Sequence, residues 1–232
     1  MLSQGVGRGF CAGADLGGLD SLATGATGAA MGSLAAALDT RGFLLTKRLS
    51  KPVIAAINGP VAGIGFAWAL TCDVRFANRD AKFSCAFSKR GLVAEWGTSF
   101  LLPRLVGTGN AMMLLLSSEV FLGDEAHRLG LVQRVCDGDC VEQAMRFAQR
   151  LADGVSPTSL AVIKRQVWKH PLMDDEEALR QSTAMMKSSL TPKNADFKEG
   201  VQSFMQKRKP AFAPLSATNP VVLTMDDVMG KL

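Results

Sequence analysis

A short, wholly apolar run restricts the fold of this chain more than any other feature of its sequence. The segment Pro52–Ile57 reads PVIAAI, and continuous hydrophobicity of this length is typical of a strand that is buried on both faces. The glycine-rich segment 58–65 follows and predicts a loop that opens into a helix ending near Thr71. Two more short strands are predicted at 73–77 and 81–84. Strand, loop, helix and strand in this order predict crossover units and an α/β fold.

Helices are predicted to dominate from Thr98 onward. Two helix starts carry capping signals, one at Asp124 and one where Thr191 precedes Pro192. The tail from 214 to 232 shows no clear packing pattern. The predicted elements of this half are helices over 124–129, 140–153, 157–169, 174–189 and 193–207, and a strand over 131–136. In the first half, a glycine-rich loop over 17–32 precedes apolar residues at helical spacing, which are Leu34, Ala37, Leu38, Leu45 and Leu49.

Length and composition exclude several classes of protein. A chain of 232 residues buries about 70% of its unfolded surface and needs no disulfide or metal to fold. With 47% hydrophobic and 20% charged residues, it is not a disordered, collagen-like or coiled-coil protein, and its apolar runs are too short to span a bilayer. Two histidines exclude a histidine-rich metal site, and five cysteines without a CxxC pair indicate a reducing, intracellular environment. The net charge of +5 fits an anionic ligand or a nucleic acid equally well.

Two glycine-rich turns are predicted to expose backbone N–H groups. The first ends in Gly13-Ala14-Asp15, and the second, around Gly63 and Ile64, begins a helix directly after the buried strand. Small residues let a ligand approach the backbone, and the first N–H groups of a helix favour a negative charge. Two such donors aimed at one carbonyl oxygen form an oxyanion hole, in which each is worth roughly 2.7–4 kcal/mol at the transition state. Either turn taken alone is more often a simple turn.

Six segments, in order, resemble the enoyl-CoA hydratase/isomerase (crotonase) family. They are GRGFCAGADL at Gly7–Leu16, KPVIAAING at Lys51–Gly59, CDVRFA at Cys72–Ala77, LPRLVG at Leu102–Gly107, AHRLGLV at Ala126–Val132 and FMQKRKP at Phe204–Pro210. Each segment alone is a modest match to the family, but the six together follow the family's order from about residue 5 to residue 212. The resemblance implies an α/β protein with a ββα spiral core and a C-terminal helical oligomerisation region.

The resemblance also implies a division of the chain. Residues 1–155 would form the spiral core, residues 156–213 a helical region that builds trimers, often paired into hexamers, and residues 214–232 a tail. Family members usually carry a few dozen further residues before the position that matches Met1. Those residues form the opening strands of the spiral and part of the CoA-binding surface, so we expect the opening strands to be absent here.

Candidate site residues follow from the same resemblance. Family members stabilise a thioester enolate with two backbone N–H groups, which by position belong to Ala14 and Ile64. Hydratases of the family also hold a water between two glutamates, and those positions carry Ala67 and Phe87 here. Neither side chain can transfer a proton, so a two-glutamate hydration is not expected. The residues expected to bind the substrate are Ala12, Asp15, Leu16, Gly63, Phe66, Ala67, Phe87 and Trp96.

Glu95 is the candidate acid–base residue. It lies in the segment VAEWGT at 93–98, where several isomerase branches of the family carry an acid that moves a proton between carbons of the acyl chain. Isomerisation needs only one base that removes a proton and returns it elsewhere. The alternative is that Glu95 caps a helix starting near Gly97, because an acid suits a helix N-terminus.

The sequence therefore predicts an acyl-CoA enzyme, and an isomerase rather than a hydratase. It needs no metal or redox cofactor, since coenzyme A arrives as part of the substrate. The alternatives are hydration guided by Glu95 alone and a non-catalytic CoA-binding or oligomeric subunit. We expect a homotrimer or hexamer, no membrane insertion, and no nucleic-acid partner, because no stripe of basic residues with interleaved aromatics occurs. The expected location is the cytoplasm; the peroxisomal alternative rests on Gly230-Lys231-Leu232, whose glycine fits such an address poorly.

Overall fold

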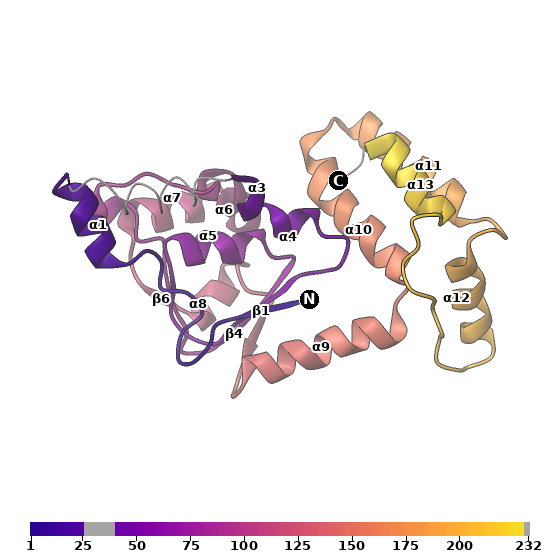
Figure 1. Ribbon diagram of the computed structural model, residues 1–232, viewed down its shortest axis with the longest axis horizontal. Helices are drawn as coiled ribbons and strands as arrows, with labels where there is room; N and C mark the ends of the chain where they lie inside the picture. Colours follow the sequence, from indigo (N-terminus) through magenta and orange to yellow (C-terminus); the bar gives the residue numbers. More distant parts are fainter. Residues whose placement is uncertain (26–39, 230–232) are drawn as a thin grey trace. The chain divides into compact units, whose positions relative to one another are not determined.

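The computed structural model describes residues 1–25 and 40–229 (Figure 1). The predicted helix around Leu34, Ala37 and Leu38, the end of the predicted glycine-rich loop and the C-terminal Gly230-Lys231-Leu232 lie outside the described residues. The chain divides into two compact units. The sheet unit comprises Leu2–Thr46 and Val53–Met145, and the helical unit comprises Met1, Lys47–Pro52 and Arg146–Leu232. The predicted boundaries at 155 and 213 stay predictions.

Two small sheets form the centre of the sheet unit. The first has four parallel strands in the order β1 (Leu2–Gln4), β2 (Ile54–Ile57), β4 (Val74–Asn78) and β7 (Arg134–Cys136). The second pairs β5 (Lys82–Ser84) with β3 (Val61–Ala62) in parallel and with β6 (Phe121–Leu122) in antiparallel fashion. The chain passes from the first sheet to the second twice, from β2 to β3 and from β4 to β5. The predicted α/β fold with a ββα spiral is confirmed.

β2 is the most deeply buried strand of the unit. All four of its residues are buried, because β1 and β4 flank it in the sheet and helices cover it. The helix α5 (Ile64–Thr71) follows the predicted loop and is apolar around most of its circumference, with six buried residues. Figure 1 shows α5 grouped with α6 (Thr98–Val106) and α7 (Thr108–Ser117). The predicted strands at 51–57, 73–77 and 81–84, and the helix ending at Thr71, are confirmed.

The remaining helices of the sheet unit are short. Among the described residues they are α1 (Leu16–Ala23), α3 (Thr40–Phe43), the beginning of α4 (Leu45–Arg48), the 3₁₀ helix η1 (Ser88–Arg90), α8 (Gly123–Arg128) and the beginning of α9 (Cys140–Gly154). The predicted loop over 17–32 is wrong for residues 17–23, which lie in α1. The prediction that Asp124 caps α8 is wrong. The cap residue is Leu122, without a side-chain hydrogen bond, and the Asp124 carboxylate instead pairs with the guanidinium of Arg79.

The helical unit follows the predicted order of helices. After α9 (Cys140–Gly154) come α10 (Pro157–Lys169), the 3₁₀ helix η2 (His170–Leu172), α11 (Asp175–Ser189) and α12 (Ala195–Met205). The predicted start of the last helix at Thr191 and Pro192 is wrong. The Thr191 hydroxyl donates to the carbonyl of Ser188 at the end of α11, and α12 begins only after its cap residue, Asn194.

The C-terminal segment forms a packed helix, α13 (Pro220–Met229). The prediction of a tail without a packing pattern is therefore wrong for these residues. Figure 1 shows α13 lying along α11. The reason is that α10 and α11 offer an apolar surface, on which a single cluster buries Val162, Met185, Val221, Val222, Met225 and Met229.

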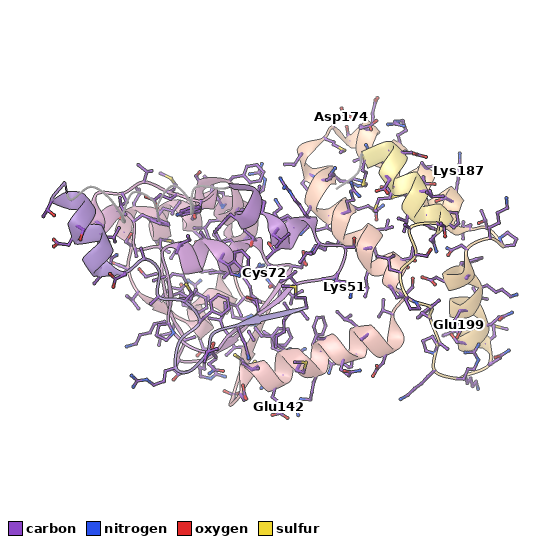
Figure 2. All side chains as sticks on the ribbon, viewed as in Figure 1. Lys51, Cys72, Glu142, Asp174, Lys187 and Glu199 are labelled. Carbon is purple, nitrogen blue, oxygen red and sulfur yellow. The ribbon has the colours of Figure 1, made fainter. Side chains whose placement is uncertain are left out.

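Polar side chains fix the ends of these helices. Ser156 Oγ accepts a hydrogen bond from Ser159 N (3.0 Å) and caps α10, and Asp174, labelled at the start of α11 in Figure 2, accepts one from Glu177 N (2.7 Å). Capping of this kind is worth about 1 kcal/mol per helix. Within residues 1–25 and 40–229, the helices are all too short or too polar to cross a bilayer.

Arg75 is a buried cation on β4, and its side chain is 2% exposed. Its guanidinium donates hydrogen bonds to the carbonyl oxygens of Leu131 (2.6 Å), Cys72 (2.7 Å) and Ala69 (3.3 Å). The last two acceptors lie at the C-terminal end of α5, where carbonyl groups lack helical partners. Burial lowers the pKa of Arg75 to about 10, so the side chain stays charged at neutral pH and locks α5 to the sheet.

We predict that Arg75→Met lowers the free energy of unfolding by about 3 kcal/mol, because it leaves buried carbonyl oxygens without a donor. Urea unfolding followed by circular dichroism measures the change. Arg128→Met is the control, since Arg128 is exposed and pairs only with Glu125 on its own helix; it should change stability little. Equal losses in the two variants would contradict the assigned role of Arg75.

Candidate active site

Two glycines let the loop after β1 lie directly on the loop after β2. A Cβ atom on Gly59 would come within 2.0 Å of the carbonyl oxygen of Arg8, and one on Gly65 within 2.3 Å of the carbonyl oxygen of Cys11. No other residue fits at such distances, because the neighbouring atoms belong to the backbone. The two loops can therefore make backbone contact along their length.

Hydrogen bonds between the two loops form a short parallel ribbon. The N–H groups of Phe10 and Cys11 both donate to the carbonyl of Pro60 (3.1 and 3.2 Å), and Ala62 N donates to the carbonyl of Cys11 (2.9 Å). Cys11 and Val61 form a parallel β-bridge. The ribbon carries the first glycine-rich turn to the start of α5.

The structure brings the two predicted glycine turns together. Gly13 has a φ of +97°, and a Cβ atom there would lie 3.0 Å from the carbonyl oxygen of Ala62. A Cβ atom on Gly63 would lie 3.9 Å from Gly13 Cα. The turn that precedes α1 therefore lies so close to the residue that caps α5 that a side chain on Gly13 would crowd the backbone of Ala62.

Ala14 and Ile64, the predicted donors, directly follow these two glycines. Ala14 is exposed and Ile64 is half-buried. Neither N–H group has an acceptor among residues 1–25 and 40–229. Ile64 is the first residue of α5, so its N–H also lies at the positive end of a helix dipole. An oxyanion hole needs two such donors aimed at one oxygen, and the two neighbouring turns each offer one.

Glu95 lies in the turn between η1 and α6. Its side chain is half-buried, and its carboxylate forms no hydrogen bond or ion pair within the part of the chain that the structure describes. The alternative role as a helix cap is wrong, because α6 is capped by Gly97 without any side-chain hydrogen bond. An unpaired, partly buried carboxylate is free to accept a proton.

Aromatic contacts connect the Glu95 turn to α5. Trp96 has a φ of +56°, and its ring packs against Phe43 with centroids 5.2 Å apart. Phe43 in turn meets Trp68 edge-on at 5.9 Å. Trp68 lies on α5, the helix that begins with Ile64, so these rings fix the turn that carries Glu95 relative to the second predicted donor.

The other predicted substrate-binding residues fall into two groups. Near the first turn, Ala12 and Leu16 are exposed, and Asp15 caps α1 by accepting a hydrogen bond from Gly18 N (2.8 Å). Three others are buried in the sheet unit: Phe66 and Ala67 on α5, and Phe87 before η1. Phe66 packs edge-on against Phe121. Whether these residues bind a substrate stays a prediction.

A polar cleft of about 900 Å³ at the carboxyl ends of the four parallel strands was not predicted. Arg79 hydrogen-bonds Asp137 there and lowers the pKa of that carboxyl group. The sequence signal was a polar residue directly after three of the four strands, which are Asn58 after β2, Arg79 after β4 and Asp137 after β7. Among the described residues, no cluster of His, Cys, Asp and Glu gathers that could hold a metal ion.

Comparison with known proteins identifies the family. The family model described as enoyl-CoA hydratase/isomerase matches residues 2–214. The chain is 36% identical to the 1,2-epoxyphenylacetyl-CoA isomerase of Escherichia coli (strain K12) and 34% identical to a probable enoyl-CoA hydratase of Bacillus subtilis (strain 168), in each case over 91% of this chain and 80% of the relative. The crystal structure of an enoyl-CoA hydratase from Polaromonas sp. JS666 matches with a TM-score of 0.80 and 30% identity, over 91% of this chain and 81% of that one. The chain belongs to the enoyl-CoA hydratase/isomerase family.

Proposed function

We propose that this protein shifts a double bond along the acyl chain of an enoyl-CoA. The observation that carries the proposal is the close approach of the Gly13–Ala14 turn to the Gly63–Ile64 turn, each of which ends in a backbone N–H without an acceptor among the described residues. The relatives include both an isomerase and a probable hydratase by name. The choice between the two reactions therefore depends on the side chains around the donors.

In the proposed mechanism, the thioester oxygen of the substrate accepts hydrogen bonds from Ala14 N–H and Ile64 N–H. Loss of a proton from the acyl chain moves negative charge onto this oxygen as the enolate forms. Both donors belong to backbone held by neighbouring glycines, so they need little reorganisation as the charge develops. Removing one donor of this kind costs roughly 2.7–4 kcal/mol in other enzymes.

Glu95 would move the proton in this mechanism. Its carboxylate takes a proton from C2 of a 3-enoyl-CoA, and the electron pair of the broken C–H bond moves onto the thioester oxygen as a dienolate forms. The same carboxyl group then returns the proton to C4, while the electron pair flows back from the oxygen and leaves the double bond between C2 and C3. Substrate and product have the same atoms and oxidation state, so the reaction needs no metal or redox cofactor, and coenzyme A enters as part of the substrate.

Hydration by two glutamates is disfavoured by the side chains at the matching positions. Ala67 is fully buried and Phe87 is 4% exposed, and neither can accept or donate a proton. A water held between two carboxylates has no counterpart there. Glu95 would be the only carboxylate of this set, and a single base suffices for a proton shift but not for orienting water from both sides.

We predict that Glu95→Gln lowers kcat for conversion of 3-hexenoyl-CoA to its 2-enoyl isomer by at least about 100-fold. Glutamine keeps the shape of glutamate but cannot accept a proton. The absorbance of the conjugated thioester measures the rate. Glu119→Gln, at an exposed carboxylate of the same unit, should leave kcat unchanged. An unchanged rate in Glu95→Gln would exclude Glu95 as the base.

We also predict that the wild-type protein isomerises 3-hexenoyl-CoA faster than it hydrates crotonyl-CoA. The reason is that the Ala67 and Phe87 positions offer no second proton carrier. Mass spectrometry measures hydration, which adds the mass of one water, and the absorbance of the conjugated thioester measures isomerisation, which leaves the mass unchanged. Faster hydration of crotonyl-CoA would assign the protein to the hydratases and overturn the proposed isomerase.

A further inference from the structure

The Asn58 side chain ties the loop after β1 to the end of β2. Its Nδ2 donates to the carbonyl oxygens of Gly7 (2.9 Å) and Gly5 (3.2 Å), and its Oδ1 accepts from Gly5 N (3.3 Å). Asn58 is half-buried. An amide is the side chain that offers two donors and an acceptor on adjacent atoms, so neither an acid nor an alcohol of this size reproduces all of these bonds.

A second amide fixes the backbone of Asn58 itself. Asn78, the last residue of β4, donates from Nδ2 to the carbonyl oxygen of Asn58 (3.1 Å). Its Oδ1 accepts from Cys140 N (3.0 Å) at the start of α9. The carboxyl ends of three neighbouring strands and the start of α9 are thus joined through two side-chain amides.

The side-chain amides of Asn58 and Asn78, which together form a clamp, lie at the point where both donor-bearing segments leave the sheet. The segment that begins at Gly5 runs along the loop after β2, hydrogen-bonded to Pro60 and Ala62, until Gly13 meets Gly63. The second loop is also held by the second sheet, because it leads into β3, which pairs with β5, and Gly63 N donates to the carbonyl of Ser84 (3.3 Å). Asn58 supplies the side-chain connection between the first loop and the end of β2.

We infer that Asn58 is a positioning residue that sets the relative placement of the Ala14 and Ile64 N–H groups. This inference rests on the proposed function. Asn58 acts through the two loops, and its removal should let the first loop shift against the second. A misplacement of about 1 Å can cost about 100-fold in rate, and the loss falls on the transition state, where the donors bind most strongly.

Gln133 provides a matched control at the opposite end of the same sheet. Its Oε1 accepts from Arg75 N (2.9 Å), and its Nε2 donates to the carbonyl of Gly130 (3.2 Å). This amide also joins two strands, because it links the entry of β7 to β4. It lies at the amino ends of the strands, away from both donor turns, so its removal tests general loosening of the sheet.

The experiment compares Asn58→Ala and Gln133→Ala with the wild-type chain. We expect at least a tenfold fall in kcat for 3-hexenoyl-CoA in Asn58→Ala, with KM within about threefold of the wild-type value. Gln133→Ala should keep the wild-type kcat. If the alanine variant does not fold, Asn58→Asp replaces it, because aspartate keeps the shape and the acceptor but loses both donors. The same fall in kcat is then expected for Asn58→Asp. A wild-type kcat in the folded Asn58 variant would overturn the inference.

Amide hydrogen exchange adds a measurement that does not depend on activity. Exchange over residues 5–14 should be faster in Asn58→Ala than in the wild-type chain and unchanged in Gln133→Ala. An unchanged exchange rate over these residues in Asn58→Ala would show that Asn58 does not hold the first loop. If the wild-type chain shows no isomerisation, the proposed function fails alone, and the exchange of residues 5–14 still decides whether Asn58 holds the loop.

Discussion

The close approach of two backbones at Gly59 and Gly65 is the constraint on which the rest of the sheet unit depends. A single Cβ atom at either position would overlap with the backbone of Arg8 or Cys11 and push the loops apart. With the loops apart, the ribbon through Pro60 would not form. The same steric requirement therefore joins the loop after β1 to the segment that leads into α5 and carries the Ala14 turn to the start of that helix.

The ends of the short parallel strands show how the unit satisfies its polar backbone groups. Strands of this length have many end groups relative to their internal ladder bonds, so side chains must supply partners. Arg75 and Gln133 do so beside the amino ends of β4 and β7, and Asn58 and Asn78 do so at the carboxyl ends. The two ends of the sheet differ in what these side chains hold. The carboxyl-end amides hold the loops that carry the predicted donors, whereas Arg75 and Gln133 hold the strands themselves.

Local patterns predicted the elements whose burial is set by their own sequence, and they failed where another element decides. The apolar run of β2 and the glycine turns needed no further context. The start of α12 was misplaced because the Thr191 hydroxyl bonds back to α11. Packing of the Val221 and Met225 side chains depends on a surface made by α10 and α11, which no local pattern reveals. Likewise, the rings that hold the Glu95 turn come from segments far apart in the sequence.

In the proposed mechanism, backbone N–H groups stabilise the negative charge and a side chain transfers the proton. The donors at Ala14 and Ile64 are main-chain groups, so their placement depends on the glycines and on Asn58 rather than on their own side chains. Side-chain substitutions around these donors can therefore change which proton is transferred, while the negative charge on the thioester oxygen is stabilised in the same way. Ala67 and Phe87 leave no proton carrier beside the donors, and the unpaired Glu95 carboxylate lies on a separate turn. In the proposed mechanism, the same pair of backbone donors serves a hydration or a proton shift, and the carboxylates around it select the reaction.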